Sequence, residues 1–134
     1  MRFRNFDTTP TRTQKLELLR EKVAAELVTI AVTIEGIPTA TQRLLRYRTT
    51  QALDLVAASS LGDADIAATA STVFTVKING VTAGTITFGA GQTVGVAAFT
   101  VTAVPLGALL EIYAPGSVDA TLSNITLALA ATKP

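Results

Sequence analysis

Residues 72–88, TVFTVKINGVTAGTITF, contain the most regular pattern in the sequence and decide the fold. Apolar and polar residues alternate on both sides of Asn79-Gly80, and this two-residue period is typical of half-buried strands. Both residues of the Asn-Gly pair tolerate positive φ, so the pair favours a tight hairpin turn. The residues predicted to face inward are Phe74, Val76, Ile78, Ile86 and Phe88. The stretch therefore predicts a β-hairpin with one apolar face.

Shorter alternating segments lie on both sides of this hairpin. They cover residues 28–34, 43–48, 53–55, 94–101, 109–113 and 124–130. Residues 58–71 are rich in Ala, Ser and Asp, and we expect them to form a loop with little core content. About seven or eight short strands separated by turn residues are typical of a β-sandwich or jelly roll. The predicted fold class is therefore mainly β.

The N-terminal part of the chain has a different period. Thr11 and Gln14 fit a capping box, in which each side chain satisfies a free backbone N–H at the start of a helix. Apolar residues then recur every three or four positions, which predicts one helix over residues 12–26. They are Leu16, Leu19, Val23 and Leu27. The helix could pack on its own sandwich, form a short trimeric bundle or dock on a partner.

We accordingly expect a short N-terminal α-helix before the β-sandwich, and two parts in the chain. Residues 1–40 are predicted to hold an extended and helical anchor together with the first strand. Residues 41–134 are predicted to form the sandwich domain. The most apolar run, residues 94–110, is interrupted by Thr, Pro and Gly, so we expect no membrane helix and a soluble protein.

The composition excludes most catalytic chemistry. The chain of 134 residues has no Cys and no His, which removes the usual nucleophile–base pairs and most zinc sites. Asp63 and Asp65 form a close carboxylate pair, but their Gly-Asp-Ala-Asp segment lacks the further oxygen ligands of a calcium loop. A solvated turn is the expectation there. We predict a protein that is not an enzyme and that has no catalytic residues, no metal and no cofactor.

The charge pattern bears on partners. Only 16% of the residues are charged while 49% are hydrophobic. This balance fits either an alanine-rich composition or apolar surface hidden between subunits. Arg43, Arg46 and Arg48, with three arginines before residue 13, could form a basic patch that faces solvent or contacts an acidic neighbouring subunit. Nucleic-acid binding normally adds aromatic stacking platforms, so we do not expect it.

Five segments in the second half of the chain occur in an order that resembles a module of tailed-phage structural proteins, including tail-fibre-like and capsid-associated ones. They are residues 73–80 (VFTVKING), 84–91 (GTITFGAG), 110–115 (LEIYAP), 119–122 (DATL) and 125–129 (ITLAL). The resemblance covers about residues 41–132. Within it, Asp119 is expected to cap the turn before the last strand through its side chain.

The resemblance implies a structural protein of the virion, such as a tail-fibre, baseplate or capsid-decoration subunit that acts by assembly. Its partners would be other virion proteins and further copies of itself, and low charge together with the habit of phage fibres suggests a homotrimer. The alternative is a host-receptor or carbohydrate-binding module, although the chain has no Trp and two Tyr, Tyr47 and Tyr113. The side chains expected at the assembly interface are Phe3, Phe6, Leu16, Leu19 and Val23.

Overall fold

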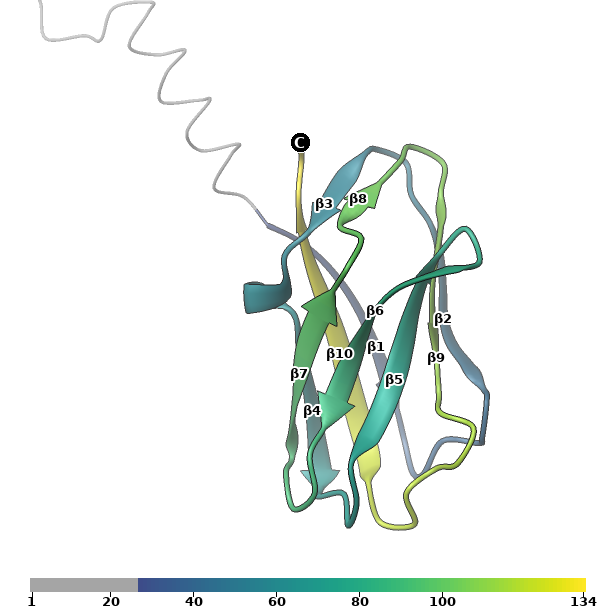
Figure 1. Cartoon of the computed structure of the whole chain (residues 1–134), viewed down its shortest axis with the longest axis vertical. Helices are drawn as coiled ribbons and strands as arrows, with labels where there is room; N and C mark the ends of the chain where they lie inside the picture. Colours follow the sequence, from purple (N-terminus) through teal and green to yellow (C-terminus); the bar gives the residue numbers. More distant parts are fainter. Residues whose placement is uncertain (1–26) are drawn as a thin grey trace, which may run out of the picture.

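The structure is a computed structural model that describes residues 27–134, and in this part of the chain it is mainly β (Figure 1). Ten strands form one antiparallel sheet, with a single short 3-10 turn, η1. The strands are β1 (Val28–Ile34), β2 (Arg43–Arg48), β3 (Leu53–Leu55), β4 (Leu61–Ile66), β5 (Thr72–Ile78), β6 (Val81–Phe88), β7 (Val94–Phe99), β8 (Ala103–Val104), β9 (Leu109–Tyr113) and β10 (Ser123–Thr132), and η1 is Ala57–Ser59. The predicted fold class, mainly β, is confirmed. The helix predicted over residues 12–26 lies outside the described residues.

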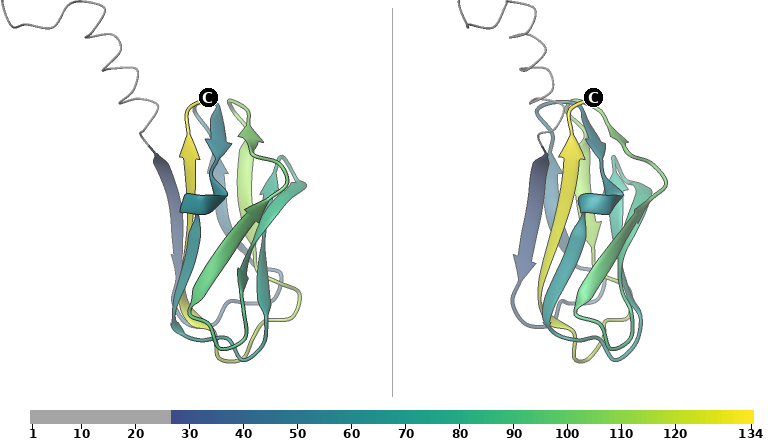
Figure 2. Two further views of the ribbon diagram at one scale, coloured as in Figure 1. Left: turned by 60° about the vertical axis from the view of Figure 1, so that its left-hand side comes forward. Right: turned by 90° about the vertical axis from the view of Figure 1, so that its left-hand side faces the viewer.

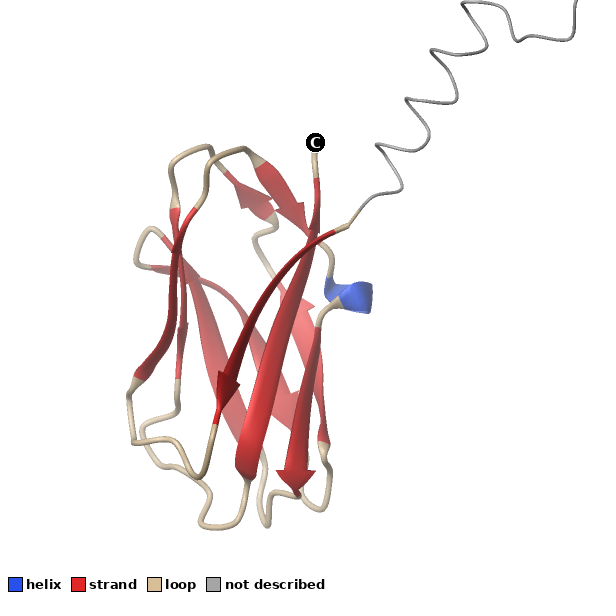
Figure 3. Ribbon diagram, turned by 180° about the vertical axis from the view of Figure 1, so that it is seen from behind, coloured by secondary structure: helices blue, strands red, loops and turns tan. Residues whose placement is uncertain are grey.

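The sheet is bent so that its two halves face each other. The strand order is β2-β9-β5-β6-β7-β4-β10-β3-β8, and β1 pairs with the other edge of β10. Seen from behind, β1, β10 and β4 lie in front of β5, β6 and β9 (Figure 3). The turned views show the same two layers from the side (Figure 2). The bend falls between β7 and β4, which pair through only three positions.

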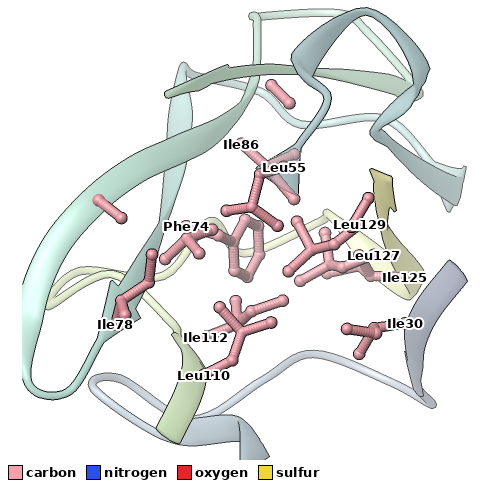
Figure 4. Packing of buried hydrophobic residues seen from close by; sticks show 14 of the residues in the cluster. Ile30, Leu55, Phe74, Ile78, Ile86, Leu110, Ile112, Ile125, Leu127 and Leu129 are labelled. Atoms are coloured by element: carbon pink, nitrogen blue, oxygen red, sulfur yellow. The ribbon is translucent and has the colours of Figure 1, made fainter. Parts of the chain in front are cut away.

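The core lies between the two halves of the sheet. One half contributes inward side chains from β5, β6 and β9, and the other contributes them from β10, β1 and β3. Phe74 lies in the middle of this group (Figure 4). Its ring meets Phe88 edge to face, with the ring centroids 5.8 Å apart. The largest side chains that are almost fully buried are Phe74, Phe88, Leu53, Ile86, Leu110, Ile112, Leu122, Ile125, Leu127 and Leu129.

The hairpin predicted at residues 72–88 is confirmed. Asn79 and Gly80 have φ values of 51° and 81°, and Ile78 pairs with Val81 across the turn. Positive φ at both central positions matches the right-handed twist of the two strands. The second strand of the hairpin begins at Val81, three residues before the regular alternation that is visible in the sequence.

The large apolar side chains of two further strands also face the core. On β9, Leu110 and Ile112 face the core, and on β10 the residues Ile125, Leu127 and Leu129 do so. β1 pairs with β10 over its whole length, from Val28–Ala131 to Ile34–Ile125. The first strand therefore belongs to the same sheet as the strands after residue 40.

The prediction of a loop over residues 58–71 is wrong for its central part, because Leu61–Ile66 forms β4. This strand pairs with both β10 and β7. Its inward residues are Gly62 and Ala64, which are too small to give the usual apolar signal of a strand. Gly62 pairs with Gly95 of β7, and the ring of Phe88 occupies the space beside both glycines. A large residue on a third strand thus supplies the core content that β4 lacks.

β3 and β4 pair with successive parts of the same edge of β10, and η1 connects them as a short interruption of the pairing. Ser60 bridges this interruption through its side chain. Its hydroxyl donates to the Val56 carbonyl oxygen at 2.7 Å and accepts from the Ala130 N–H at 2.9 Å. Ser60 is buried, and these two bonds satisfy the hydroxyl as well as a ladder N–H that the interruption leaves without a strand partner.

Candidate interaction surfaces

The side chains predicted for the assembly interface, Phe3, Phe6, Leu16, Leu19 and Val23, lie outside the described residues. The described chain starts at Leu27, next to the end of β10, because Val28 pairs with Ala131. Any anchor before residue 27 is therefore attached at the end of the sheet that also carries the C-terminus (Figure 1).

A row of aliphatic side chains lies exposed on the outer surface where the sheet bends. Leu61 of β4 pairs with Val96 of β7, and their exposed fractions are 52% and 67%. Val96 pairs in turn with Thr87 of β6, which pairs with the exposed Val73 of β5. We call Leu61, Val96 and Val73 the aliphatic row, and Thr87 lies between the two valines. These side chains stay exposed although the core is filled by other residues.

The aliphatic row was not predicted, although the sequence contains a signal for it. In residues 94–98, VGVAA, large and small apolar residues alternate. Because Gly95 and Ala97 are the buried ones, Val94 and Val96 must point outward. Gly95 faces inward against the Phe88 ring, since a Cβ added there would lie 2.9 Å from an atom of that ring. When the small residues of an apolar strand face the core, its large apolar residues must face outward.

The outer side of β2, β9 and β5 carries four basic side chains around one carboxylate, and we call it the basic face. Glu111 lies at its centre and is only 5% exposed. Its Oε2 accepts from Arg43 at 3.2 Å and from the Tyr113 hydroxyl at 3.0 Å. The Lys77 ammonium lies 5.0 Å from the centre of the Tyr113 ring, within the range of a cation–π contact.

The two remaining arginines of the basic face are exposed on β2. Arg46 and Arg48 point outward while Leu45 and Tyr47 point toward the core. Arg48 donates to the carbonyl oxygen of Gly107 at 2.8 Å, which holds its stem along the sheet. Arg46 pairs with Glu111 in the strand register and is exposed. Glu111 thus offsets only part of the positive charge on this face.

The outer side of β1, β10 and β4 is acidic, and we call it the acidic face. It contains a hollow of about 370 Å³, which is lined by Thr33, Ile34, Glu35, Asp63, Asp65, Asn124 and Thr126. Asp63 and Asp65 were expected in a solvated turn, but they stand on the outward side of strand β4 because Gly62 and Ala64 take the inward positions. The strands β1, β4 and β10 contain no basic residue. Within the described residues, no group of acidic residues is placed to hold a metal ion.

Asp119 has a structural role in the loop before β10. Its Oδ1 accepts from the backbone N–H groups of Thr121 and Leu122, which confirms the predicted turn cap. Its Oδ2 accepts from the N–H and hydroxyl of Thr69 and from the N–H of Ala70, so the same carboxylate also binds the β4–β5 loop. The hydroxyl of Thr69, and then the N–H groups of Thr121, Leu122 and Ala70, hold the pKa of Asp119 well below its usual range.

The two tyrosines do not share a surface. Tyr47 is half-buried and packs against the core, whereas Tyr113 lies on the basic face beside Glu111. Stacking platforms for sugar rings or bases need aromatic faces that are exposed on one side of the molecule. The described residues therefore offer no paired platform of tyrosines.

Comparison of the chain with protein-family models, with curated proteins and with solved structures found no match. In the described part of the chain, no helix has the length and apolar character needed to cross a membrane.

Proposed function

We propose that this chain is a structural protein of a tailed-phage virion, used as a tail-fibre, baseplate or capsid-decoration subunit. In this proposal the bent sheet is a β-sandwich, residues before 27 anchor it to other virion proteins, and its copies associate with one another, as in a homotrimer. The protein acts by assembly and performs no catalysis. The resemblance of residues 41–132 to modules of phage structural proteins supports the virion as the location.

The observation that carries the assembly role is the aliphatic row. Leu61, Val96 and Val73 stay exposed although the core between the two halves of the sheet is filled by larger side chains. Exposed apolar side chains on one side of a sheet lose little hydration when another protein covers them, which suits contact between proteins. A subunit that remained free in solution gains nothing from such a row.

The alternative, a host-receptor or carbohydrate-binding module, is less well supported. Carbohydrate sites favour exposed aromatic side chains, and Tyr47 and Tyr113 lie on opposite sides of the sheet. The hollow on the acidic face has no aromatic residue in its lining. An assay of host-cell adsorption separates the two functions, because only the receptor-binding function predicts that the purified chain blocks adsorption.

The proposal is tested by incorporation into particles. Deleting residues 1–26 leaves every described strand in place, so we expect a folded protein that no longer incorporates into virions. The control is the full chain with the same tag, which should be found in purified particles by mass spectrometry. Absence of the full chain from particles would contradict the virion role. Incorporation of the deletion variant would contradict the anchor.

A further inference from the structure

We propose that copies of this chain stack face to face, the basic face of one copy lying against the acidic face of the next. This inference rests on the proposed assembly role and specifies which surfaces the copies use. The basic face is formed by β2, β9 and β5, and the acidic face by β1, β10 and β4. The partner is a second copy because one and the same chain carries both of the complementary surfaces.

The two faces point in opposite directions. Leu110 of β9 and Leu127 of β10 both point into the core from their own halves of the sheet (Figure 4). Side chains alternate along a strand, so the neighbours of these residues point away from the core on the two outer sides. Glu111 and Thr126 are such neighbours, one at the centre of the basic face and one in the lining of the acidic hollow. A copy can therefore offer one face to each of two neighbours.

The charges on the two faces have the same spacing. Arg46 and Arg48 are two residues apart on β2, and Asp63 and Asp65 are two residues apart on β4. All four are exposed. Two residues of extended strand span about 6.8 Å, so the two pairs repeat at the same interval. Packed sheets lie about 10 Å apart, which an extended arginine side chain can bridge.

The hollow on the acidic face has the chemistry of a guanidinium site. Its polar lining of three carboxylates, the Asn124 amide and two threonine hydroxyls can supply hydrogen-bond acceptors. An arginine offers five N–H donors in a planar fork, which suits such a set of acceptors better than an ammonium group does. Asn124 is held in place there, since its Oδ1 accepts from Gly36 N–H and its Nδ2 lies 3.2 Å from Asp65 Oδ2. Arg46, which is exposed on β2, is the arginine that we assign to this hollow.

The aliphatic row borders the acidic face. Leu61 is two residues from Asp63 on β4, and its other neighbour in the register is Ala128 of β10. Exposed ion pairs are individually weak and are screened by salt. An apolar strip beside them adds contact that salt does not weaken, so we expect salt to reduce the association without abolishing it. A contact between two different faces joins copies head to tail. Such a contact forms a closed ring only if each copy is rotated relative to the one before it, and otherwise forms an open filament.

Charge reversal on each face in the full chain tests the inference. The variant R46E/R48E makes both faces acidic, and the variant D63R/D65R makes both faces basic. Each variant alone should sediment as a monomer of 13.9 kDa, with self-association at least about tenfold weaker than that of the unaltered chain. An equimolar mixture of the two should associate again, because one variant then supplies the acidic surface and the other the basic one.

The mixture also controls for folding, since misfolded variants cannot restore each other. K133E changes a charge after the end of β10, outside the strands that form the two faces, and should associate like the unaltered chain. Three results overturn the inference: a monomeric unaltered chain at all concentrations, a charge-reversed variant that still associates alone, or a mixture that stays monomeric. If the mixture stays monomeric and the unaltered chain retains nucleic acid during purification while R46E/R48E does not, the basic face serves another partner and stacking is excluded.

The stacking inference and the virion role fail in different ways. Charge-reversed variants that enter particles as well as the unaltered chain overturn stacking and leave the virion role standing. Restored association in the mixture, together with absence of the unaltered chain from particles, supports stacking and contradicts the virion role.

Discussion

Gly62 and Gly95 face each other at the bend of the sheet, and the ring of Phe88 fills the space beside them. A Cβ added at Gly62 would lie 2.6 Å from Cζ of Phe88 and 3.1 Å from Cγ2 of Ile86. Neither side chain can move aside easily, because both are fully buried. The small size of Gly62 is therefore required for β4 to pair with β7.

We expect Gly62→Ala to lower the free energy of unfolding by roughly 1–3 kcal/mol through overpacking. Chemical denaturation of the purified variant measures this change. The matched control is Gly116→Ala, because a Cβ there meets no atom within 4 Å and its φ lies outside the left-handed region. That control should be neutral or slightly stabilising. Equal stability of the two variants would contradict the packing role of Gly62.

Asp119 holds two loops together, since its carboxylate accepts hydrogen bonds from both of them. Asp119→Asn keeps the shape but removes the charge and one of the two acceptor oxygens, so we expect a lower Tm at pH 7. Asp54→Asn on β3 changes the charge equally away from these loops and serves as the control. Its Tm should stay close to that of the unaltered chain.

The low pKa of Asp119 also predicts a pH dependence. A carboxyl group whose pKa is lower in the folded state stabilises the fold fully above its unfolded pKa of about 3.9. The contribution declines as the pH falls from there toward the folded pKa. We therefore expect the difference in Tm between the unaltered chain and Asp119→Asn to narrow below about pH 4. A difference that stays constant down to acid pH would contradict this role of the charged carboxylate.

At the scale of elements, the β5–β6 hairpin is joined to β9 by its own turn. The N–H of Asn79 donates to the carbonyl oxygen of Leu109 at 2.8 Å, and its Oδ1 accepts from the N–H of Leu109 at 2.9 Å. Asn79 also has a φ of 51°. One residue thus provides both the turn conformation and a hydrogen bond to the next strand of the sheet.

These two roles can be separated by two substitutions. Asn79→Gly keeps the positive φ but loses the side-chain bond, and we expect a loss of about 0.5–1.5 kcal/mol in unfolding free energy. Asn79→Ala also strains the backbone, which adds about 1–2 kcal/mol. Thermal and urea denaturation should therefore rank the unaltered chain above Asn79→Gly, and Asn79→Ala last. The reverse order of the two variants would show that φ is not the limiting requirement.

At the scale of the whole molecule, the sheet depends on contacts between the two ends of the described chain. β1 pairs with β10 through seven residue pairs, and Ile30 of β1 is buried in the core. A chain that starts at residue 27 retains these contacts. A chain that starts at residue 36 lacks β1 and exposes both the core and the edge of β10.

We expect the chain that starts at residue 27 to unfold cooperatively and the chain that starts at residue 36 to lose cooperative unfolding or to aggregate, since it uncovers an unpaired apolar edge. Circular dichroism during thermal denaturation distinguishes the two. Cooperative unfolding of the shorter chain at an unchanged Tm would show that β1 is dispensable. It would also support residue 40 as a division between two separate parts.

The sequence by itself determined those features of the protein that depend on local pattern. Alternation of large apolar residues located β1, β2, β5, β9 and β10, since residues next but one along a strand share a face whatever the strand packs against. Asn79-Gly80 located a turn for the same local reason, because its backbone preference belongs to the two residues themselves. The absence of Cys and His narrowed the available chemistry without any structure.

Only the tertiary structure decided the position of β4, the surfaces and the distribution of charge on them. Gly62 and Ala64 gave no apolar signal because Phe88, which is distant in the sequence, fills the space beside them. The aliphatic row and the two charged faces exist because strand order brings together residues that are far apart along the chain, such as Arg46 with Glu111 or Thr126 with Asp63. Strand order follows from how the two halves of the sheet bury each other, and that is a property of the complete core.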